Sequence, residues 1–140
     1  MYGDGKTAAH PDDARKMATM VRENVKVWRG RAEAGLKQLK AHPQVDGDKL
    51  AAIGYCFGGS TCLQLAYSGA DLKAVVTFHA ALPKPTAEEA KAIKPRVLVC
   101  HGADDFFISA DAIKAFRAAL DDAKAKYEFV SYKDAVHSFT

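Results

Sequence analysis

Apolar positions follow a helical period in the first third of the chain. Pro11 suits a first helical turn, and behind it apolar residues recur every three or four positions over residues 17–25 and again over 28–39. Pro43 stops the second stripe. We therefore expect one bent helix or two successive helices over residues 11–41, with their apolar faces packed on the rest of the protein.

From residue 50 onward, short apolar runs alternate with helical stretches. The pattern predicts strands over 50–53, 72–78, 96–100 and 127–132, and helices over 58–67, 88–93 and 110–123. Because these strands are continuously apolar, we expect an α/β fold whose parallel sheet has helices on both faces. No internal repeat or linker interrupts the pattern, so residues 1–140 are expected to form a single domain.

Composition narrows the function mainly by exclusion. The 20 basic and 17 acidic residues are scattered without a basic block, so no nucleic-acid partner is expected. Apolar runs such as 97–100 are far shorter than the roughly 20 residues that cross a bilayer, and no signal segment follows Met1, so we expect a cytoplasmic location without membrane contact. Three cysteines without C-x-x-C spacing indicate reduced thiols, with neither a disulfide framework nor a metal site, and no cofactor is implied.

The segment Gly54-Tyr55-Cys56-Phe57-Gly58 joins a predicted strand to a predicted helix. This is the context of the nucleophile elbow G-x-S-x-G, here with cysteine as the nucleophile. The turn is so tight that both flanking glycines are expected to be required, and the helix N-terminus favours a thiolate at Cys56. The Phe57 N–H is then an oxyanion-hole donor. The alternative for Cys56 is a small buried hydrophobic residue.

Candidates for the other members of a catalytic triad follow in the order that this fold requires. Asp105 and His137 each come a few residues after a predicted strand, and the carboxyl ends of parallel strands share one edge of the sheet. We expect His137 to take the proton of Cys56 and Asp105 to fix the imidazole tautomer. Asp104 is the rival to Asp105, with a solvated turn residue as its other interpretation.

Two more histidines end strands at the same edge. His79 and His101 are candidates for lining the site, as is Tyr55 beside the nucleophile. The alternative for both histidines is a hydrogen-bonded side chain near the rim of the sheet.

Three ordered motifs, at residues 53–59, 100–105 and 135–139, together resemble the dienelactone hydrolase (carboxymethylenebutenolidase) family. The resemblance implies an α/β-hydrolase fold and a Cys-Asp-His triad acting on ester or lactone carbonyls of small molecules. It also implies Asp105 as the acid, three positions after Gly102, and a site-lining place for Tyr2.

The chain departs from the family pattern at two positions and in its extent. Asp4 stands where dienelactone-cleaving members carry an arginine for the substrate carboxylate, and Ser109 stands where proline is more usual. The resemblance further implies a three-layer sheet that lacks the family's N-terminal strands and final helix. We therefore expect the strand at 50–53 to form an exposed, hydrophobic sheet edge.

These observations lead to one principal hypothesis and two alternatives. The principal hypothesis is a hydrolase that cleaves an ester or lactone through an acyl-enzyme at Cys56. The first alternative is a truncated, weakly active or inactive remnant that pairs through the exposed edge, for example as a homodimer. The second is a thiol redox protein, which the missing C-x-x-C and the absence of a resolving cysteine disfavour.

Overall fold

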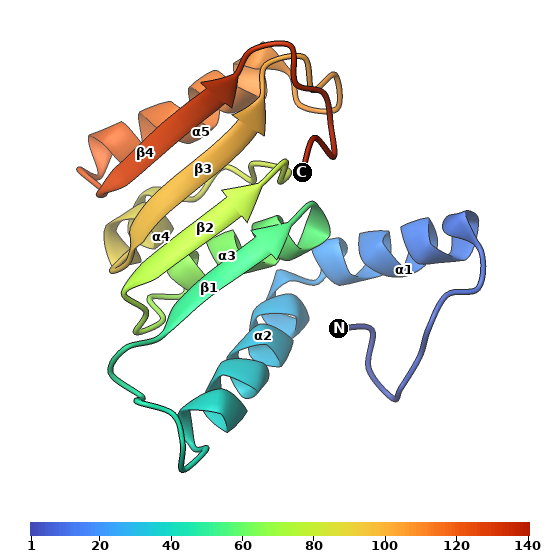
Figure 1. The fold of residues 1–140 in the computed structure, drawn as a ribbon, viewed down its shortest axis with the longest axis vertical. Coiled ribbons are helices and arrows are strands. Elements are labelled where there is room, and N and C mark those ends of the chain that lie inside the picture. The colour runs from blue at the N-terminus through green and yellow to red at the C-terminus, as the bar shows by residue number, and fades with distance from the viewer.

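The computed structural model describes all residues from 1 to 140, arranged as five helices and four strands (Figure 1). In chain order these are α1 (Pro11–Glu23), α2 (Val25–Lys40), β1 (Ala51–Tyr55), α3 (Phe57–Tyr67), β2 (Ala74–Phe78), α4 (Ala87–Ala92), β3 (Arg96–Gly102), α5 (Ala110–Asp122) and β4 (Tyr127–Tyr132). Every predicted element is present, with ends that differ by one or two residues. None of the helices has the length and apolar character needed to cross a membrane.

Local capping explains where two of the helices begin. The expected first helical region is two helices, because Asn24 interrupts it and its side chain accepts a hydrogen bond from the Val27 N–H to cap α2. Ser109, which stands where the family pattern has proline, caps α5 in the same way by accepting from the Ala112 N–H at 3.2 Å. The serine thus favours the start of α5 through a side-chain hydrogen bond, whereas a proline favours a helix start through its fixed backbone angle.

The four strands form one parallel sheet in the order β1-β2-β3-β4. Consecutive strands lie side by side, so β1 and β4 are the two edges, and β1 hydrogen-bonds to β2 alone. All four arrowheads in Figure 1 point to the same edge of the sheet. The loops that carry the candidate catalytic residues therefore leave the sheet on one side.

Helices α3, α4 and α5 cover one face of this sheet and lie behind it in Figure 1. Side chains on that face, including Val75 and Val99, are buried against Leu63 and Phe116 of the helices. On the opposite face Ile53 retains 62% of its exposure. The expectation of helices on both faces therefore holds for one face only. Each strand of this sheet is added on the same side of the one before it, in the order β1-β2-β3-β4. Because the connections between parallel strands are right-handed, all the helices between these strands lie on the same face.

Helix α2 packs beside α3, the helix that follows the elbow. Trp28 is buried and its Nε1–H donates to Thr61 Oγ1 at 2.8 Å. Arg29 donates to Gln64 Oε1 at 2.8 Å and forms an ion pair with Glu89 of α4. Burial acts to raise the pKa of Glu89, but hydrogen bonds from Thr86 and Arg29 outweigh it and hold the pKa below its ordinary value. These contacts fix α2 against the nucleophile helix.

Candidate active site

Cys56 lies on the sharp turn between β1 and α3. Its backbone has φ 49° and ψ −117°, a conformation that non-glycine residues rarely adopt, and its N–H donates to the Phe78 carbonyl at 3.0 Å. The side chain is exposed, whereas Cys62 and Cys100 are buried. The interpretation as a small buried hydrophobic residue thus fits the other two cysteines and is wrong for Cys56. Burial also raises the pKa of the Cys62 thiol, which disfavours it as a redox partner.

The glycines around the elbow differ in what they require. A Cβ on Gly54 would lie 2.3 Å from the carbonyl carbon and oxygen of Gly58 and 2.6 Å from the Gly59 nitrogen, so β1 and α3 approach too closely for a side chain. A Cβ on Gly58 would have no atom within 4 Å, contrary to the expected requirement there. The second crowded position is Gly59, whose Cβ would lie 2.7 Å from that of Ala80. The difference arises because the backbone carbonyl of Gly58, and not its Cβ position, lies against Gly54.

The carboxylate that faces His137 is Asp105. Its Oδ2 lies 2.8 Å from His137 Nδ1, and its Oδ1 accepts from the Phe107 N–H at 3.1 Å. Asp105 is 4% exposed, whereas Asp104 is exposed and is held through its backbone N–H to the Ala135 carbonyl. Of the two aspartates, Asp105, which the resemblance implies as the acid, is the one that faces the imidazole. A buried carboxylate at this position keeps the Nδ1–H tautomer and leaves Nε2 free.

The thiol and the imidazole lie close together. The Cys56 sulfur and ring nitrogens of His79 and His137 are all within 4.8 Å of one another. The Phe57 N–H, at the first position of α3, donates to no backbone carbonyl and lies beside the thiol in sequence. The turn thus presents a thiol, an imidazole, a carboxylate and a free amide at one place, which is the donor and acceptor set that acyl transfer needs.

The two additional histidines lie differently. His79 has φ 38°, its ring packs edge-on to His137 at 4.9 Å between centroids, and its Nε2 lies 3.2 Å from Thr140 Oγ1. His101 is buried on the helix-covered face, tilted against Phe129, and its Nδ1 has no partner. Burial is the main cause that lowers the pKa of each histidine, with the nearby His137 acting in the same direction. Both rings are therefore neutral near pH 7, and His79 is the one against His137.

Two tyrosines were also candidates for lining the site. Tyr55 is half exposed, stacks on Phe78 at 4.9 Å and tilts toward His79 at 6.0 Å, so it lies at the rim of the cluster. The start of the chain is held against α2 by Arg31, which donates to the Met1 carbonyl at 2.8 Å. No hydrogen bond or ring contact brings Tyr2 to the thiol or the imidazole.

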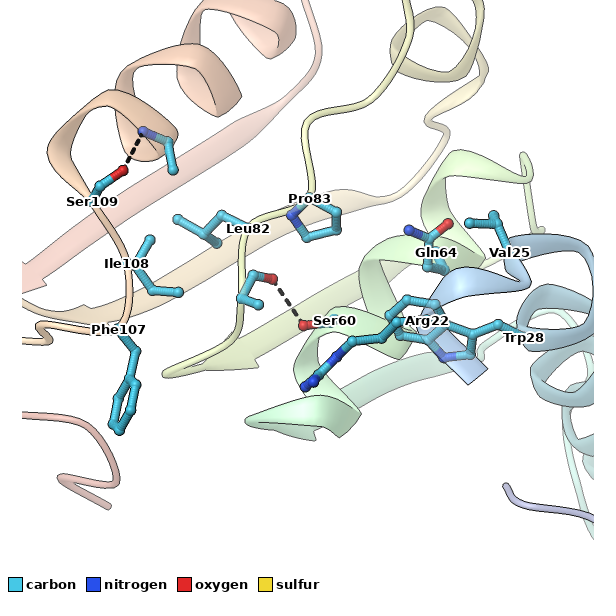
Figure 2. Close-up of a pocket in the computed structure, with 12 residues that line it drawn as sticks. Arg22, Val25, Trp28, Ser60, Gln64, Leu82, Pro83, Phe107, Ile108 and Ser109 are labelled. Carbon is cyan, nitrogen blue, oxygen red and sulfur yellow. Dashed lines mark hydrogen bonds between the residues drawn. The ribbon is translucent and has the colours of Figure 1, made fainter. Parts of the chain in front are cut away.

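A cavity of about 440 Å³ adjoins this cluster on the helix-covered side. Figure 2 shows Phe107 and Ile108 of the β3–α5 loop on one side of it and Val25 and Trp28 of α2 on the other. Its remaining lining residues are Arg22, Ser60, Gln64, Ala81, Leu82, Pro83, Ser109 and Ala112.

Two of the lining residues connect the cavity to the candidate triad. The Phe107 ring lies 4.9 Å from that of His137, and Ser60 Oγ lies 3.4 Å from the Cys56 carbonyl while donating to the Ala81 carbonyl at 2.8 Å. The sequence pattern does not reveal this cavity, because its walls come from four separate segments. The one local signal is the pair of phenylalanines after Asp105, because exposed aromatic side chains on a loop often mark a binding site.

The sequence profile of the Dienelactone hydrolase family matches residues 1–140. A Caenorhabditis elegans protein named K02A2.1 is 34% identical over 112 residues, which are 79% of this chain and 71% of that protein. A Salmonella typhimurium protein provisionally named carboxymethylenebutenolidase is 32% identical over 102 residues, which are 67% of this chain and 38% of that protein.

Solved structures show the same backbone. The chain superposes with a TM-score of 0.92 and 43% identity on m3DLH, covering 97% of this chain and 57% of that one. It superposes with a TM-score of 0.93 and 40% identity on P91, described as a dienelactone hydrolase-like promiscuous phosphotriesterase from metagenomic libraries, covering 99% of this chain and 58% of that one. The chain thus spans a little over half the length of these two structures.

Proposed function

The chain belongs to the dienelactone hydrolase family, and from this premise we propose that it hydrolyses an ester or lactone with Cys56 as nucleophile, His137 as base and Asp105 as orienting carboxylate. One observation carries the proposal: an exposed thiol on a strained strand-to-helix turn has a ring nitrogen of His137 within 4.8 Å, and Nδ1 of the same ring is 2.8 Å from the buried carboxylate of Asp105. Among the ion pairs of the chain, only His137–Asp105 joins a histidine to a carboxylate.

The proposed reaction proceeds in two halves. His137 Nε2 accepts the thiol proton as Cys56 Sγ attacks the carbonyl carbon, and the oxyanion accepts a hydrogen bond from the Phe57 N–H. Collapse of the tetrahedral intermediate breaks the bond to the alcohol oxygen, which takes the proton from the imidazolium. Water then gives a proton to His137 and attacks the thioester, releasing the acid and restoring the thiol. Asp105 accepts from Nδ1–H throughout and stabilises the imidazolium.

The surroundings of the thiol support a substrate with an apolar part. The adjoining cavity is lined mainly by apolar groups, and its one charged lining residue, Arg22, has its guanidinium 5.1 Å from the centre of the Phe57 ring. The arginine of dienelactone-cleaving members is replaced by Asp4. We therefore propose a short ester or lactone other than dienelactone itself, with its apolar group in the cavity.

The decisive experiment is hydrolysis of a short aryl ester by the intact chain and by Cys56→Ala. We expect the variant to lose the activity, whereas Cys62→Ala, which removes a buried thiol in the next turns of α3, keeps it. Equal rates for the chain and Cys56→Ala would remove Cys56 from the mechanism. A burst of alcohol release equal to the protein concentration would report the acyl-enzyme.

A second substrate class has one specific observation in its favour. P91, 40% identical to this chain, is described as a promiscuous phosphotriesterase. A thiolate that attacks a carbonyl carbon can also attack the phosphorus of a neutral phosphotriester. An aryl phosphotriester assayed beside the aryl ester tests this, and turnover that survives in Cys56→Ala would refute a shared nucleophile.

Pairing through β1 is a further candidate property. β1 has a neighbour on one side only, and Ile53 and Tyr55 on the open face are 62% and 50% exposed. Such an edge favours pairing with another strand. Sedimentation analysis of the purified chain tests this, because a concentration-independent monomer would refute self-pairing.

A further inference from the structure

Three side chains of the types that bind transition metals converge at the elbow. The Cys56 sulfur and one ring nitrogen each of His79 and His137 lie within 4.8 Å of one another. No other group of three or more potential ligands of this kind occurs in the chain. Thiolate and imidazole together are the donor set that suits zinc and its neighbours, and not magnesium or calcium.

The spacing needs little adjustment to hold such an ion. Zinc binds sulfur at about 2.3 Å and imidazole nitrogen at about 2.0–2.1 Å, so neighbouring ligand atoms of a tetrahedral site lie roughly 3.3–3.6 Å apart. Closing the present cluster to that distance takes movements of about 1 Å or less per side chain. The Cys56 side chain is exposed and His137 stands on a loop, so both have room for a small rotation.

The outer contacts of the two histidines leave nitrogens free for a metal. Asp105 holds His137 Nδ1, which leaves Nε2, and a carboxylate on the far nitrogen is the usual outer partner of a metal-binding histidine. His79 contacts Thr140 through Nε2, and its Nδ1 is buried without a hydrogen-bond partner although the residue is only 5% exposed. Each ring therefore has one nitrogen without a hydrogen bond. An unpaired buried nitrogen is unfavourable, and a cation that binds at Nδ1 of His79 would relieve that cost.

We propose that Cys56, His79 and His137 bind one zinc-class divalent cation, which occupies the nucleophile and the base together and reversibly inhibits the hydrolase. Binding replaces the thiol proton, so one proton leaves as the metal–sulfur bond forms, and no oxidant or reductant takes part. The fourth position of the ion faces solvent. The inhibition rests on the proposed function, whereas the binding does not.

The test is a titration of the intact chain with Co²⁺ alone, in the presence of a reductant that does not bind metal. We expect a thiolate-to-cobalt charge-transfer band that saturates at one equivalent. It should be lost in Cys56→Ser, and His79→Phe should weaken binding by at least about tenfold because one of three ligands is gone. Cys62→Ala and His42→Phe, which lie outside the cluster, should bind as the parent chain does.

Several results would overturn the inference. These are the absence of the band, a band that persists in Cys56→Ser, and unchanged affinity in His79→Phe when circular dichroism shows that variant to be folded. Ester hydrolysis measured with Zn²⁺ and then with a chelator gives the second readout, and we expect loss and recovery of activity. A band without any hydrolysis would support the site while refuting the proposed function, and hydrolysis without a band would do the reverse.

Discussion

Replacing Gly54 with alanine tests whether the elbow depends on the close approach of β1 to α3. The new Cβ would lie 2.3 Å from both the carbonyl carbon and oxygen of Gly58, about 1 Å inside normal contact. Both neighbours are backbone, so no side chain can rotate away. Overpacking typically costs 1–3 kcal/mol, and we expect Gly54→Ala to reach the upper end, about 3 kcal/mol.

Two measurements report the effect. For a chain of this size, a loss of about 3 kcal/mol in the free energy of unfolding lowers the melting temperature by roughly 10 °C. Urea unfolding measures the loss in free energy, and calorimetry measures the melting temperature. The collision also displaces the start of α3 from Cys56. A displacement of about 1 Å at the reacting groups is expected to lower kcat/KM for an aryl ester on the order of 10²-fold.

Gly58→Ala is the matched control, since the same methyl group there meets no atom within 4 Å. Gly58 is the second residue of α3 and has no positive φ, so alanine should leave stability unchanged or raise it by up to about 1 kcal/mol. Equal destabilisation by the two substitutions would refute the reasoning, because it would show that the requirement lies in the backbone conformation of both glycines and not in the contact at Gly54.

Three further substitutions have defined outcomes. Asp105→Asn should lower ester hydrolysis by on the order of 10²–10⁴-fold while Asp104→Asn leaves it near the parent rate, and equal effects would contradict the assignment of the acid. Glu89→Gln should lower the free energy of unfolding by about 1 kcal/mol at pH 7. The pKa of Glu89 in the folded state lies below its ordinary 4.5, so the carboxylate contributes to stability above pH 4.5. This contribution disappears as the pH falls through the lowered pKa, and the urea midpoints of the two proteins should then converge. Trp28→Phe removes the donor to Thr61 Oγ1 and should cost about 1–3 kcal/mol in urea unfolding, whereas an unchanged midpoint would show that the buried hydrogen bond contributes nothing.

Local sequence was sufficient for the elements and for their order. The strands and helices form where the period of apolar residues changes, and the elbow forms where glycine permits close packing after a strand. These features depend on residues a few positions apart. The motif around Cys56 therefore predicts its strained turn without knowledge of the rest of the chain.

The details of the site depend on contacts between distant segments. Asp104 and Asp105 are adjacent and chemically identical, and only the path of the loop buries one of them against His137. His79 and His101 both end strands, yet one packs on His137 and the other is buried beneath the sheet. The period of apolar residues encodes neither difference. For the aspartates the family motif implies Asp105, whereas no motif distinguishes the two histidines.

The sequence by itself determined a parallel α/β chain with a strand-to-helix elbow at Cys56, and it placed a candidate acid and a candidate base after it in the order that such a site requires. The tertiary structure decided which aspartate faces the imidazole, that the crowded second glycine is Gly59, and that helices cover one face of the sheet. The physical reason is the distance along the chain over which each effect acts. The apolar period and the turn residues act over a few positions. The direction of the site side chains and the placement of the helices instead depend on contacts between segments 30 or more positions apart, such as that between residues 105 and 137.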